Sequence, residues 1–288
     1  MPDTEPLIRN ISDTARWVAA YRALETSRPD ALFRDPLAAC LAGDRGRAVA
    51  ECTRHDSWPF TIRTIEFDAE IKRFVSNGVD TIVNLAAGLD TRPYRMSLPA
   101  SLRWIEMDLP EILAEKEQLL AGEKPACKLK RIPVDLTDAA ARRAAFAAVG
   151  PTTQSALVLC EGLLIYLTEA NVVSLAEDIA AVQSFRHWAV DIVTPPLFKI
   201  LKRSLERNLK HVGDAMLFAP AAGPAFFEAH GWRVTSARSL LKTAARHKRV
   251  NLFMRLIALF PDTQGKPSRQ PWGGICVLEQ CKIEESSS

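Results

Sequence analysis

The residues best suited to ligand binding stand where short apolar runs of the chain end. The first of these runs closes at Ala86-Ala87-Gly88, and a polar turn with Asp90 and Thr91 follows. Small residues let a ligand approach the backbone closely, and a glycine can also adopt positive φ. The stretch lacks the G-x-G-x-x-G pattern of dinucleotide-binding loops, which argues against a nicotinamide-dependent dehydrogenase. Taken alone, a tight turn that binds nothing explains these residues equally well.

Two acidic residues end the next apolar run. Glu106 and Asp108 lie about 20 residues beyond Gly88. In ligand-binding α/β folds, an acid at this place holds ribose hydroxyls because a carboxylate can accept two hydrogen bonds side by side. Strand alternation puts both side chains on the same side, so both remain candidates. A compatible alternative is that Asp108 caps the following helix, with Pro110 in its first turn.

A third acid, Glu161, follows the apolar run at 156–160. An acid in such a place is usually functional or paired. The five histidines include none at the end of a strand, where a base would be expected: His187 begins a strand, His211 lies in a basic helix and His230 in a turn-like setting. The six cysteines form no C-x-x-C pair and no pattern with the histidines. We therefore expect neither a metal site nor a disulfide framework.

The elements that must position these residues alternate between strands and helices. The sequence predicts strands at 81–86, 103–107, 130–134, 155–160, 187–193 and 274–282. Helical patterns occupy 13–26, 35–43, 61–78, 110–122, 138–150 and 169–183. Such alternation, with continuous apolar strands, is typical of a parallel sheet covered by helices on both faces. We expect an α/β fold with a doubly wound, mostly parallel sheet, whose loop after the first strand is the usual place for a ligand.

The second half of the chain is less regular. Basic helices are predicted at 197–218 and 239–260, with a short strand at 233–238 between them. Their cations form either a lid that attracts an anionic substrate or a solvated face. The expected division is an N-terminal helical cap at 1–78, a core at 79–283 with helical insertions near 196–230 and 239–262, and a disordered tail at 284–288.

Composition excludes several classes of protein. Hydrophobic residues make up 48% and charged residues 25%, as in ordinary globular proteins. A net charge of +3, without a block of Lys/Arg and interleaved aromatics, argues against a nucleic-acid partner. The N-terminus lacks the apolar core of a signal peptide, and the apolar stretch 156–167 is too short to span a bilayer. We expect a cytoplasmic protein without a membrane partner, whose oligomeric state cannot be read from the sequence.

Seven stretches are informative as a set, in this order and spacing: ARWVAAYRALE (15–25), RPDALFRDPLA (28–38), IRTIEFD (62–68), NLAAGLDTRPYR (84–95), WIEMDLPEIL (104–113), PVDLTD (133–138) and LCEGLLIYLT (159–168). Together they resemble the class I S-adenosylmethionine-dependent methyltransferases of the leucine carboxyl methyltransferase type, and most closely its bacterial branch with polyketide carboxyl O-methyltransferases. The resemblance covers residues 10 to 280, roughly. It implies a Rossmann-like, seven-stranded methyltransferase sheet with N-terminal helices and a helical lid. It also implies S-adenosylmethionine as cofactor, S-adenosylhomocysteine as product and an anionic small-molecule acceptor.

The resemblance also implies roles for individual residues. Arg63 matches an arginine that meets the carboxylate of S-adenosylmethionine and also suits a substrate carboxylate, and Asp108 matches the ribose-binding acid. The remaining matches to cofactor-binding positions are Ala87, Gly88, Leu109, Asp135 and Leu136 beside the adenine, Glu161 and Gly162. Tyr166 and, more weakly, Arg22 match acceptor-binding positions, and Arg63, Glu161 and Tyr166 form the expected catalytic group. By residue type alone, Asp135 is a turn residue at a strand end and Tyr166 a core aromatic.

The chain departs from the family pattern in two places. Many relatives carry Gly-Ala-Gly where this chain has Ala86-Ala87-Gly88, and the extra methyl is tolerated if Ala86 keeps β-region dihedrals. The basic residue that closes the cofactor site near the N-terminus matches either Arg16 or Arg22, of which we favour Arg22.

The acidity of the acceptor decides which groups the reaction needs. A carboxylic acid of pKa ~4 is already ionised at pH 7, whereas a phenol or alcohol usually requires a base or a metal. The lack of a well-placed histidine and the resemblance both favour a carboxylate acceptor and a methyl ester product. The alternatives are a hydroxyl or phenol O-methyltransferase of secondary metabolism and a non-catalytic, cofactor-binding regulatory protein.

Overall fold

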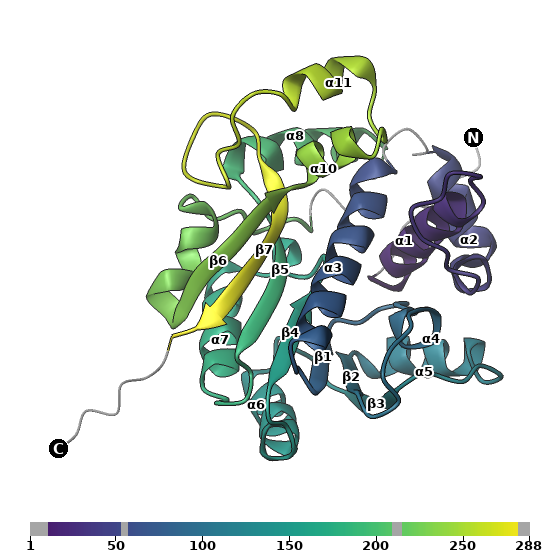
Figure 1. Cartoon of the computed structure of the whole chain (residues 1–288), viewed down its shortest axis with the longest axis vertical. Helices are drawn as coiled ribbons and strands as arrows, with labels where there is room; N and C mark the ends of the chain where they lie inside the picture. The colour runs from purple at the N-terminus through teal and green to yellow at the C-terminus, as the bar shows by residue number, and fades with distance from the viewer. Residues whose placement is uncertain (1–10, 53–56, 209–214, 282–288) are drawn as a thin grey trace, which may run out of the picture.

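A single mixed sheet organises the part of the chain that the computed structural model describes, which is residues 11–52, 57–208 and 215–281. Across these residues seven strands have the order β3-β2-β1-β4-β5-β7-β6 (Figure 1). Their bounds are β1 (Thr81–Leu85), β2 (Arg103–Asp108), β3 (Lys128–Pro133), β4 (Ala156–Cys160), β5 (His187–Val193), β6 (Trp232–Ser239) and β7 (Gly273–Gln280). The expected tail at 284–288 lies outside the described residues.

Strands β1 to β5 run parallel, and β7 lies antiparallel between β5 and β6. The strand order reverses at β1, which pairs with β2 on one side and β4 on the other; Val83 aligns with Ile105 and Val158. At such a switch point the loops diverge and leave room beyond the carboxyl ends of the strands. The sequence-based expectation of a doubly wound, mostly parallel sheet is confirmed.

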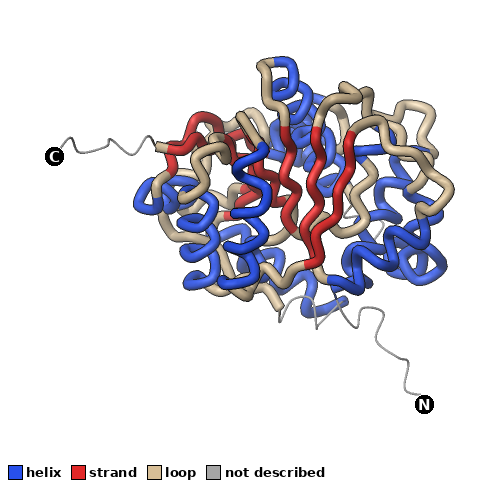
Figure 2. Tube along the Cα trace, turned by 90° about the horizontal axis from the view of Figure 1, so that it is seen from below, coloured by secondary structure: helices blue, strands red, loops and turns tan. Residues whose placement is uncertain are grey.

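Helices cover both faces of the sheet, as Figure 2 shows from below. Their bounds are α1 (Ile11–Thr26), α2 (Ala38–Cys52), α3 (Trp58–Ser76), α4 (Arg92–Arg95), α5 (Pro110–Leu119), α6 (Ala139–Val149), α7 (Glu169–Ala180), α8 (Pro195–Asn208), α10 (Leu240–Arg246) and α11 (Leu252–Ile257). Short 3-10 turns lie at η2 (Gly150–Thr152), η3 (Leu164–Tyr166) and η4 (Gly223–His230). Asp138 and Thr168 cap α6 and α7 with their side-chain oxygens, which fixes where these helices begin.

Alternate residues of the strands enter two separate cores. Val83 and its neighbours on one face pack against α6, α7 and η4, whereas Ile82 and its neighbours on the other face pack against Phe67 and Phe74 of α3. Because α3 packs on the sheet itself, Arg63 near its start is held at the carboxyl edge. A third core joins α1 and α2 around Trp17. The division at residue 78 would separate α3 from the sheet it covers, and it stays a prediction.

The second half departs from the helices expected there. The described part of α8 ends at Asn208, and Leu217 and Phe218 are not helical, since their amides bond to the carbonyl of Ile165. The expected helix at 239–260 is interrupted, because Lys248 has φ 55° and Asn251 caps a new helix by accepting from the Met254 amide. Among the described helices, none is both long and apolar enough to cross a bilayer.

Candidate active site

The loop after β1 brings small residues to the carboxyl edge of the sheet. Ala86 has φ 51° and Gly88 has φ 47°, so both adopt left-handed dihedrals. The condition that Ala86 keep β-region dihedrals is therefore not met, because the chain turns at once and the Asp90 amide reaches the Ala87 carbonyl at 3.0 Å. A left-handed alanine costs about 1–2 kcal/mol, which a glycine at this position avoids.

Asp108, the acid that ends β2, holds this loop. Its Oδ2 accepts from the Gly88 amide at 2.6 Å and its Oδ1 from the Leu109 amide at 2.7 Å. Burial raises the pKa of Asp108 despite these two hydrogen bonds. An ionised carboxylate offers roughly four acceptor positions, so two remain for the hydroxyls of a ribose.

Glu106 has a different task, although it lies on the same side of β2. Its fully buried carboxylate pairs with Lys116 Nζ at 2.7 Å and with Arg131 Nε at 3.0 Å. Both oxygens are thus committed to cations that tie β2 to α5 and β3. Of the two acids that the sequence left open, Asp108 is the one that is not paired with cations, and its contact with a ribose stays a prediction.

Arg63 of α3 lies between two acids from neighbouring strands. Its Nε donates to Glu161 at 3.1 Å and its Nη1 to Asp191 at 3.2 Å. Burial alone would lower the pKa of Arg63, but Asp191 and Glu161 outweigh burial and raise it. For Asp191 burial is the larger effect and raises the pKa, although Arg63 opposes it. Arg63 is therefore a fixed cation, and among the described residues no group is bonded to its Nη2.

Arg63 can occupy this position because residue 162, which lies against its guanidinium, is a glycine without a side chain. Its φ is 71°, and a Cβ at this residue would lie 3.0 Å from Arg63 Nη1. Its amide donates to Asp191 Oδ1 at 2.7 Å, so one carboxylate orients both the arginine and the turn after β4. Asp191 was missed in the sequence. The available signal was a single acid in the otherwise apolar strand HWAVDIV.

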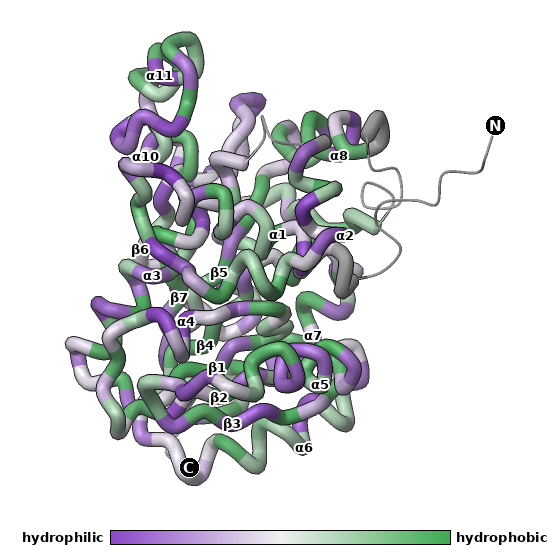
Figure 3. Tube along the Cα trace, turned by 90° about the vertical axis from the view of Figure 1, so that its right-hand side faces the viewer, coloured by the Kyte–Doolittle hydropathy of each residue, from purple (hydrophilic) through white to green (hydrophobic). Residues whose placement is uncertain are grey.

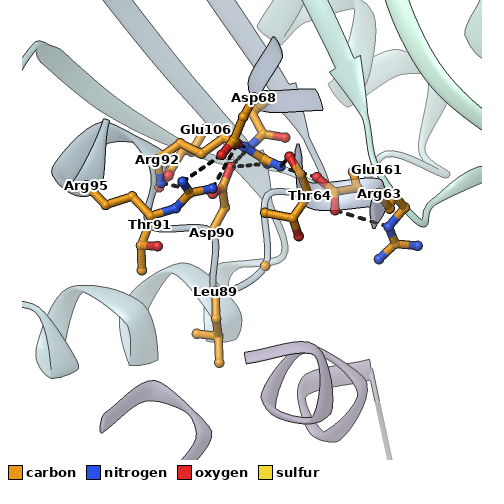
Figure 4. A network of polar contacts seen from close by, with 12 residues as sticks. Arg63, Thr64, Asp68, Leu89, Asp90, Thr91, Arg92, Arg95, Glu106 and Glu161 are labelled. Carbon is orange, nitrogen blue, oxygen red and sulfur yellow. Dashed lines mark hydrogen bonds and ion pairs between the residues drawn. The ribbon is translucent and has the colours of Figure 1, made fainter. Parts of the chain in front are cut away.

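Arg92 extends this network toward the loop after β1. Its guanidinium reaches Asp68 at 2.6 Å, Asp90 at 3.1 Å and Glu161 at 2.8 Å, and Figure 4 shows these side chains converging on Arg92. We call six residues the charged cluster: Arg63, Asp68, Asp90, Arg92, Glu161 and Asp191. The sequence analysis assigned no role to Arg92 or Asp68, although both lie in motifs that carry the resemblance.

Within the cluster, cations lower the pKa of two carboxyl groups, Asp68 and Asp90, despite their burial. Burial would raise the pKa of Asp68, but Arg92 and Arg95 together lower it. Burial would likewise raise the pKa of Asp90, and Arg92 is the main cation that lowers it. The pKa of Arg92 is raised well above its usual value because three acids outweigh its burial. This arrangement fixes the loop by charge rather than by apolar packing.

Asp135 and Leu136 follow β3 at the same edge. Asp135 is exposed, and its Oδ1 accepts from the amide of Thr137 at 2.8 Å and from its hydroxyl at 2.7 Å. These hydrogen bonds lower the pKa of Asp135. Leu136 is buried, and its carbonyl accepts from Arg142. A turn-forming role for Asp135 is thus visible, and contact with adenine stays a prediction.

The two acceptor-site candidates differ in their surroundings. Arg22 is buried, and it donates to Asp35 at 2.8 Å and to the Leu89 carbonyl at 2.6 Å, so it ties α1 to the loop after β1. Tyr166 packs against the core between α1 and α2, and burial raises the pKa of its hydroxyl while the charge of Arg63 lowers it less. Contact of either residue with an acceptor stays a prediction.

Other chemistry finds little support among the described residues. In the parts of the chain that the structure describes, no group of three or more His, Cys, Asp and Glu side chains could hold a metal ion. His187 lies against Phe74 at the amino end of β5, and His230 lies beside Glu177 of α7. Both are remote from the carboxyl edge, and His211 lies outside the described residues.

Comparison with known proteins places this geometry in a family. The sequence profile of the leucine carboxyl methyltransferase family matches residues 15–180. A Frankia alni protein named as a candidate S-adenosyl-L-methionine-dependent methyltransferase is 38% identical over 59% of this chain and 64% of its own length. A Mycobacterium protein with the same kind of name is 32% identical over 80% of this chain and 85% of its own. A Mycobacteroides abscessus relative is 36% identical and is covered over 58% of its length, so the chain spans less than two thirds of some relatives.

Solved structures support the fold alone. A candidate methyltransferase from Thermobifida fusca matches with a TM-score of 0.56 at 16% identity, covering 98% of this chain and 97% of its own. A protein of the DUF574 family from Streptomyces avermitilis matches with a TM-score of 0.57 at 10% identity, covering 92% and 97% respectively.

The matched profile includes α3, the loop after β1, Asp108 and the turn after β4, and of the charged cluster only Asp191 lies beyond it. The cofactor named by the relatives is the one that the sequence led us to expect. The chain therefore belongs to the leucine carboxyl methyltransferase family of S-adenosylmethionine-dependent methyltransferases.

Proposed function

We propose that this protein is an O-methyltransferase that transfers the methyl group of S-adenosylmethionine to the carboxylate of a small molecule, which yields a methyl ester. The observation that carries the proposal is Arg63, a half-buried cation fixed by Glu161 and Asp191 at the carboxyl edge of the sheet. A planar guanidinium grips carboxylates with two parallel hydrogen bonds. In this site it suits the carboxylate of the cofactor and an anionic acceptor.

The residues around the loop after β1 fit the cofactor. The unused acceptor positions of Asp108 suit the ribose hydroxyls, and the small side chains of Ala87 and Gly88 let the methionine portion lie against the backbone. Asp135 and Leu136 are proposed beside the adenine, with Leu109, Glu161 and Gly162 completing the pocket. S-adenosylmethionine supplies an activated methyl group on its sulfonium.

The chain itself contributes position more than acid–base chemistry. Methyl transfer needs the acceptor oxygen, the methyl carbon and the sulfur in line, and such positioning supplies about 7–11 kcal/mol of the barrier reduction. Arg63 and Arg92 both pair with Glu161, so its side chain cannot rotate freely and the turn after β4 keeps one conformation. A tyrosine of ordinary pKa ~10 is protonated at pH 7, and burial raises the pKa of Tyr166 further, so its hydroxyl can donate a hydrogen bond but not act as a base.

The acceptor class follows from what the described part of the site lacks. Among the described histidines, His187 and His230 lie away from the carboxyl edge, and His247 is exposed at the end of α10. No described group of residues could bind a metal. A carboxylic acid of pKa ~4 needs no deprotonation at pH 7, whereas a phenol of pKa ~10 would be ionised in about one part in a thousand. A carboxylate acceptor is therefore favoured.

The test is chemical and acts on the product. The protein is incubated with methyl-labelled S-adenosylmethionine and a panel of small-molecule carboxylic acids and phenols, and the products are treated with alkali. A methyl ester releases labelled methanol, as we expect, whereas a methyl ether does not. An ether as the main product would overturn the carboxylate assignment. Cofactor binding without any transfer across the panel and a metabolite extract would favour a regulatory protein.

A variant of Arg63 sharpens this test. Arg63→Lys keeps the charge but loses the planar pair of donors. The activation free energy should therefore rise by about 1–3 kcal/mol, which slows turnover. Steady-state kinetics would show the loss in kcat and in kcat/KM. Unchanged kinetics would remove Arg63 from the reaction, and a circular dichroism melt would show that the variant is folded.

A further inference from the structure

Large apolar side chains gather on one exposed segment of the second half of the chain. The chain exposes Leu252, Phe253, Leu256, Ile257, Leu259 and Phe260, with relative exposures of 37% to 79%. Among the described residues, only Ile200 and Leu217 are other large apolar side chains exposed to this degree. We call residues 252–260 the apolar segment. In Figure 3 the α11 region, largely green, projects at the top of the molecule.

Cations surround the apolar segment. Residues 240–269 contain seven Lys and Arg and a single acid, Asp262. That acid accepts from the Trp272 indole at 2.8 Å, which turns it toward the protein. Lys248, Arg255, Lys266 and Arg269 are exposed. Between α10 and α11 runs a groove of about 530 Å³, which Leu252, Leu256 and Leu259 line together with Lys242, Arg246 and Arg255.

The base of this projection is firmly attached. Arg249 pairs with Glu25 and Asp30 at 2.7 Å each, which joins the turn before α11 to the N-terminal helices. Thr243 of α10 donates to Glu66 of α3 at 2.6 Å. The apolar side chains are therefore presented on a fixed support.

The apolar segment also has a defined orientation relative to the active site. β6 runs parallel to β5, because each is antiparallel to β7, so α10 starts from the same edge of the sheet as the loop after β5. Figure 1 shows α8, α10 and α11 together at this end. A partner surface that contacts the apolar segment would therefore lie on the side of the molecule at which the loop after β1 lies.

We propose that the apolar segment docks this protein onto an anionic lipid bilayer. Apolar side chains that enter the boundary between headgroups and acyl chains, with Lys and Arg beside them, are the arrangement that binds such a surface. Each cation near an anionic bilayer adds to the attraction, and each apolar side chain adds through burial. The docking revises the expectation from sequence that no membrane is a partner, which addressed spanning segments.

A second copy of the chain is a poorer occupant. A two-fold interface places the same patch of each copy against the other, so Arg255 and Lys248 of one copy would approach those of the other. The patch offers no free acid to compensate this repulsion, since Asp262 is bonded to Trp272. A bilayer with anionic headgroups supplies the missing charge.

The experiment is co-sedimentation of the full chain with vesicles of phosphatidylcholine, with and without phosphatidylglycerol. We expect the protein to pellet with the anionic vesicles and to stay in solution with the neutral ones. Phe253→Ser combined with Phe260→Ser should weaken partitioning by about tenfold, since two apolar anchors are lost. Leu217→Ser, which changes an exposed apolar residue outside the segment, is the matched control and should bind as the unaltered protein does.

The charge contribution has its own readout. Lys248→Gln combined with Arg255→Gln should weaken binding to anionic vesicles and reduce its dependence on salt. The proposal is overturned if the unaltered protein does not pellet with anionic vesicles, or if the double serine variant pellets equally. It is also overturned if light scattering shows a dimer that the serine variants dissociate while vesicles are not bound, because the second copy is then the occupant.

Discussion

The charged cluster and the apolar segment use the same kinds of side chain in opposite ways. In the cluster, Arg92 is almost fully buried and contacts three acids, so charge is compensated and the geometry is fixed. In the apolar segment, Phe253 and Phe260 face outward, and Arg255 is exposed beside them. The first arrangement is complete within one chain. The second becomes complete only against another surface, which is why we assign chemistry to the first and docking to the second.

The strongest way to break this comparison is to remove one cation from each region. Arg92→Met removes a cation that three acids share: Asp68 keeps Arg95 and Glu161 keeps Arg63, but Asp90 loses the cation that contacts it. An uncompensated buried charge costs about 3–5 kcal/mol. Arg255→Met is the matched control, and its free energy of unfolding should stay within about 0.5 kcal/mol of the unaltered protein because the residue is exposed. Urea denaturation measures both. Equal effects of the two substitutions would contradict the contrast.

Acid weakens the same cluster more gently. The pKa values of Asp68 and Asp90 are lowered in the folded protein, mainly by Arg92 acting against burial. Their contribution to stability is thus present above the unfolded carboxyl pKa of ~4 and is lost as pH falls. The raised pKa values of Asp108 and Asp191 act in the opposite direction, so a difference between variants is the cleaner measurement.

We expect the stability difference between the unaltered protein and Arg92→Met to shrink as pH falls below about 4. The physical reason is that protonated Asp68 and Asp90 no longer need the arginine. Urea denaturation at a series of pH values from neutral to strongly acidic would show this. A difference that is constant with pH would mean that Arg92 stabilises the fold through packing and not through charge.

Much of the fold was predictable because it depends on local patterns. The apolar strands and the periodic helices predicted the parallel part of the sheet to within a few residues. The helix expected at 35–43 is an exception, because α2 (Ala38–Cys52) continues beyond a kink at Gly43. The interruption at Lys248 was not predictable, because no residue there is a glycine or proline and the break depends on a cap at Asn251. The positive φ of Ala86 was not predictable either, because an alanine gives no indication of left-handed backbone dihedrals.

The strand-end acids of the candidate site could be named from the sequence, whereas the residues that contact them could not, and the ligand roles of the acids stay predictions. Asp108 and Glu161 were identified because acids that end apolar strands are unusual. Asp191 and Arg92 act by contacting Arg63 and Glu161 from other elements, and these contacts span 128 and 69 residues of sequence, respectively. Such pairings depend on how the strands are ordered, and a single sequence does not encode that order visibly.

Cofactor affinity sharpens the comparison within the sheet. Asp108→Asn should weaken S-adenosylmethionine binding by about 1–3 kcal/mol through lost charged hydrogen bonds. Asp80 is the matched control, since it also accepts from two backbone amides, those of Gln154 and Ser155, but at the amino edge. Asp80→Asn should leave the affinity unchanged. Calorimetry on folded variants decides, and an unaffected Asp108→Asn would reject the ribose assignment.

The smallest expected effect compares the backbone of the two regions. Ala86 in the loop after β1 and Lys248 between α10 and α11 both hold left-handed dihedrals, with φ of 51° and 55°. A side chain in this conformation costs about 1–2 kcal/mol, whereas glycine loses roughly 0.5–1 kcal/mol more in conformational entropy on folding. Ala86→Gly and Lys248→Gly should therefore each raise the free energy of unfolding by up to about 1 kcal/mol. Ala87→Gly, at a residue without positive φ, should instead lower it by about 0.5–1 kcal/mol.

The two stabilising variants should differ in their effects on binding. Ala86→Gly changes the loop after β1 and should leave vesicle binding intact, whereas Lys248→Gly removes a cation and should weaken vesicle binding alone. A destabilised Ala86→Gly variant would show that the strain assigned to this loop is absent.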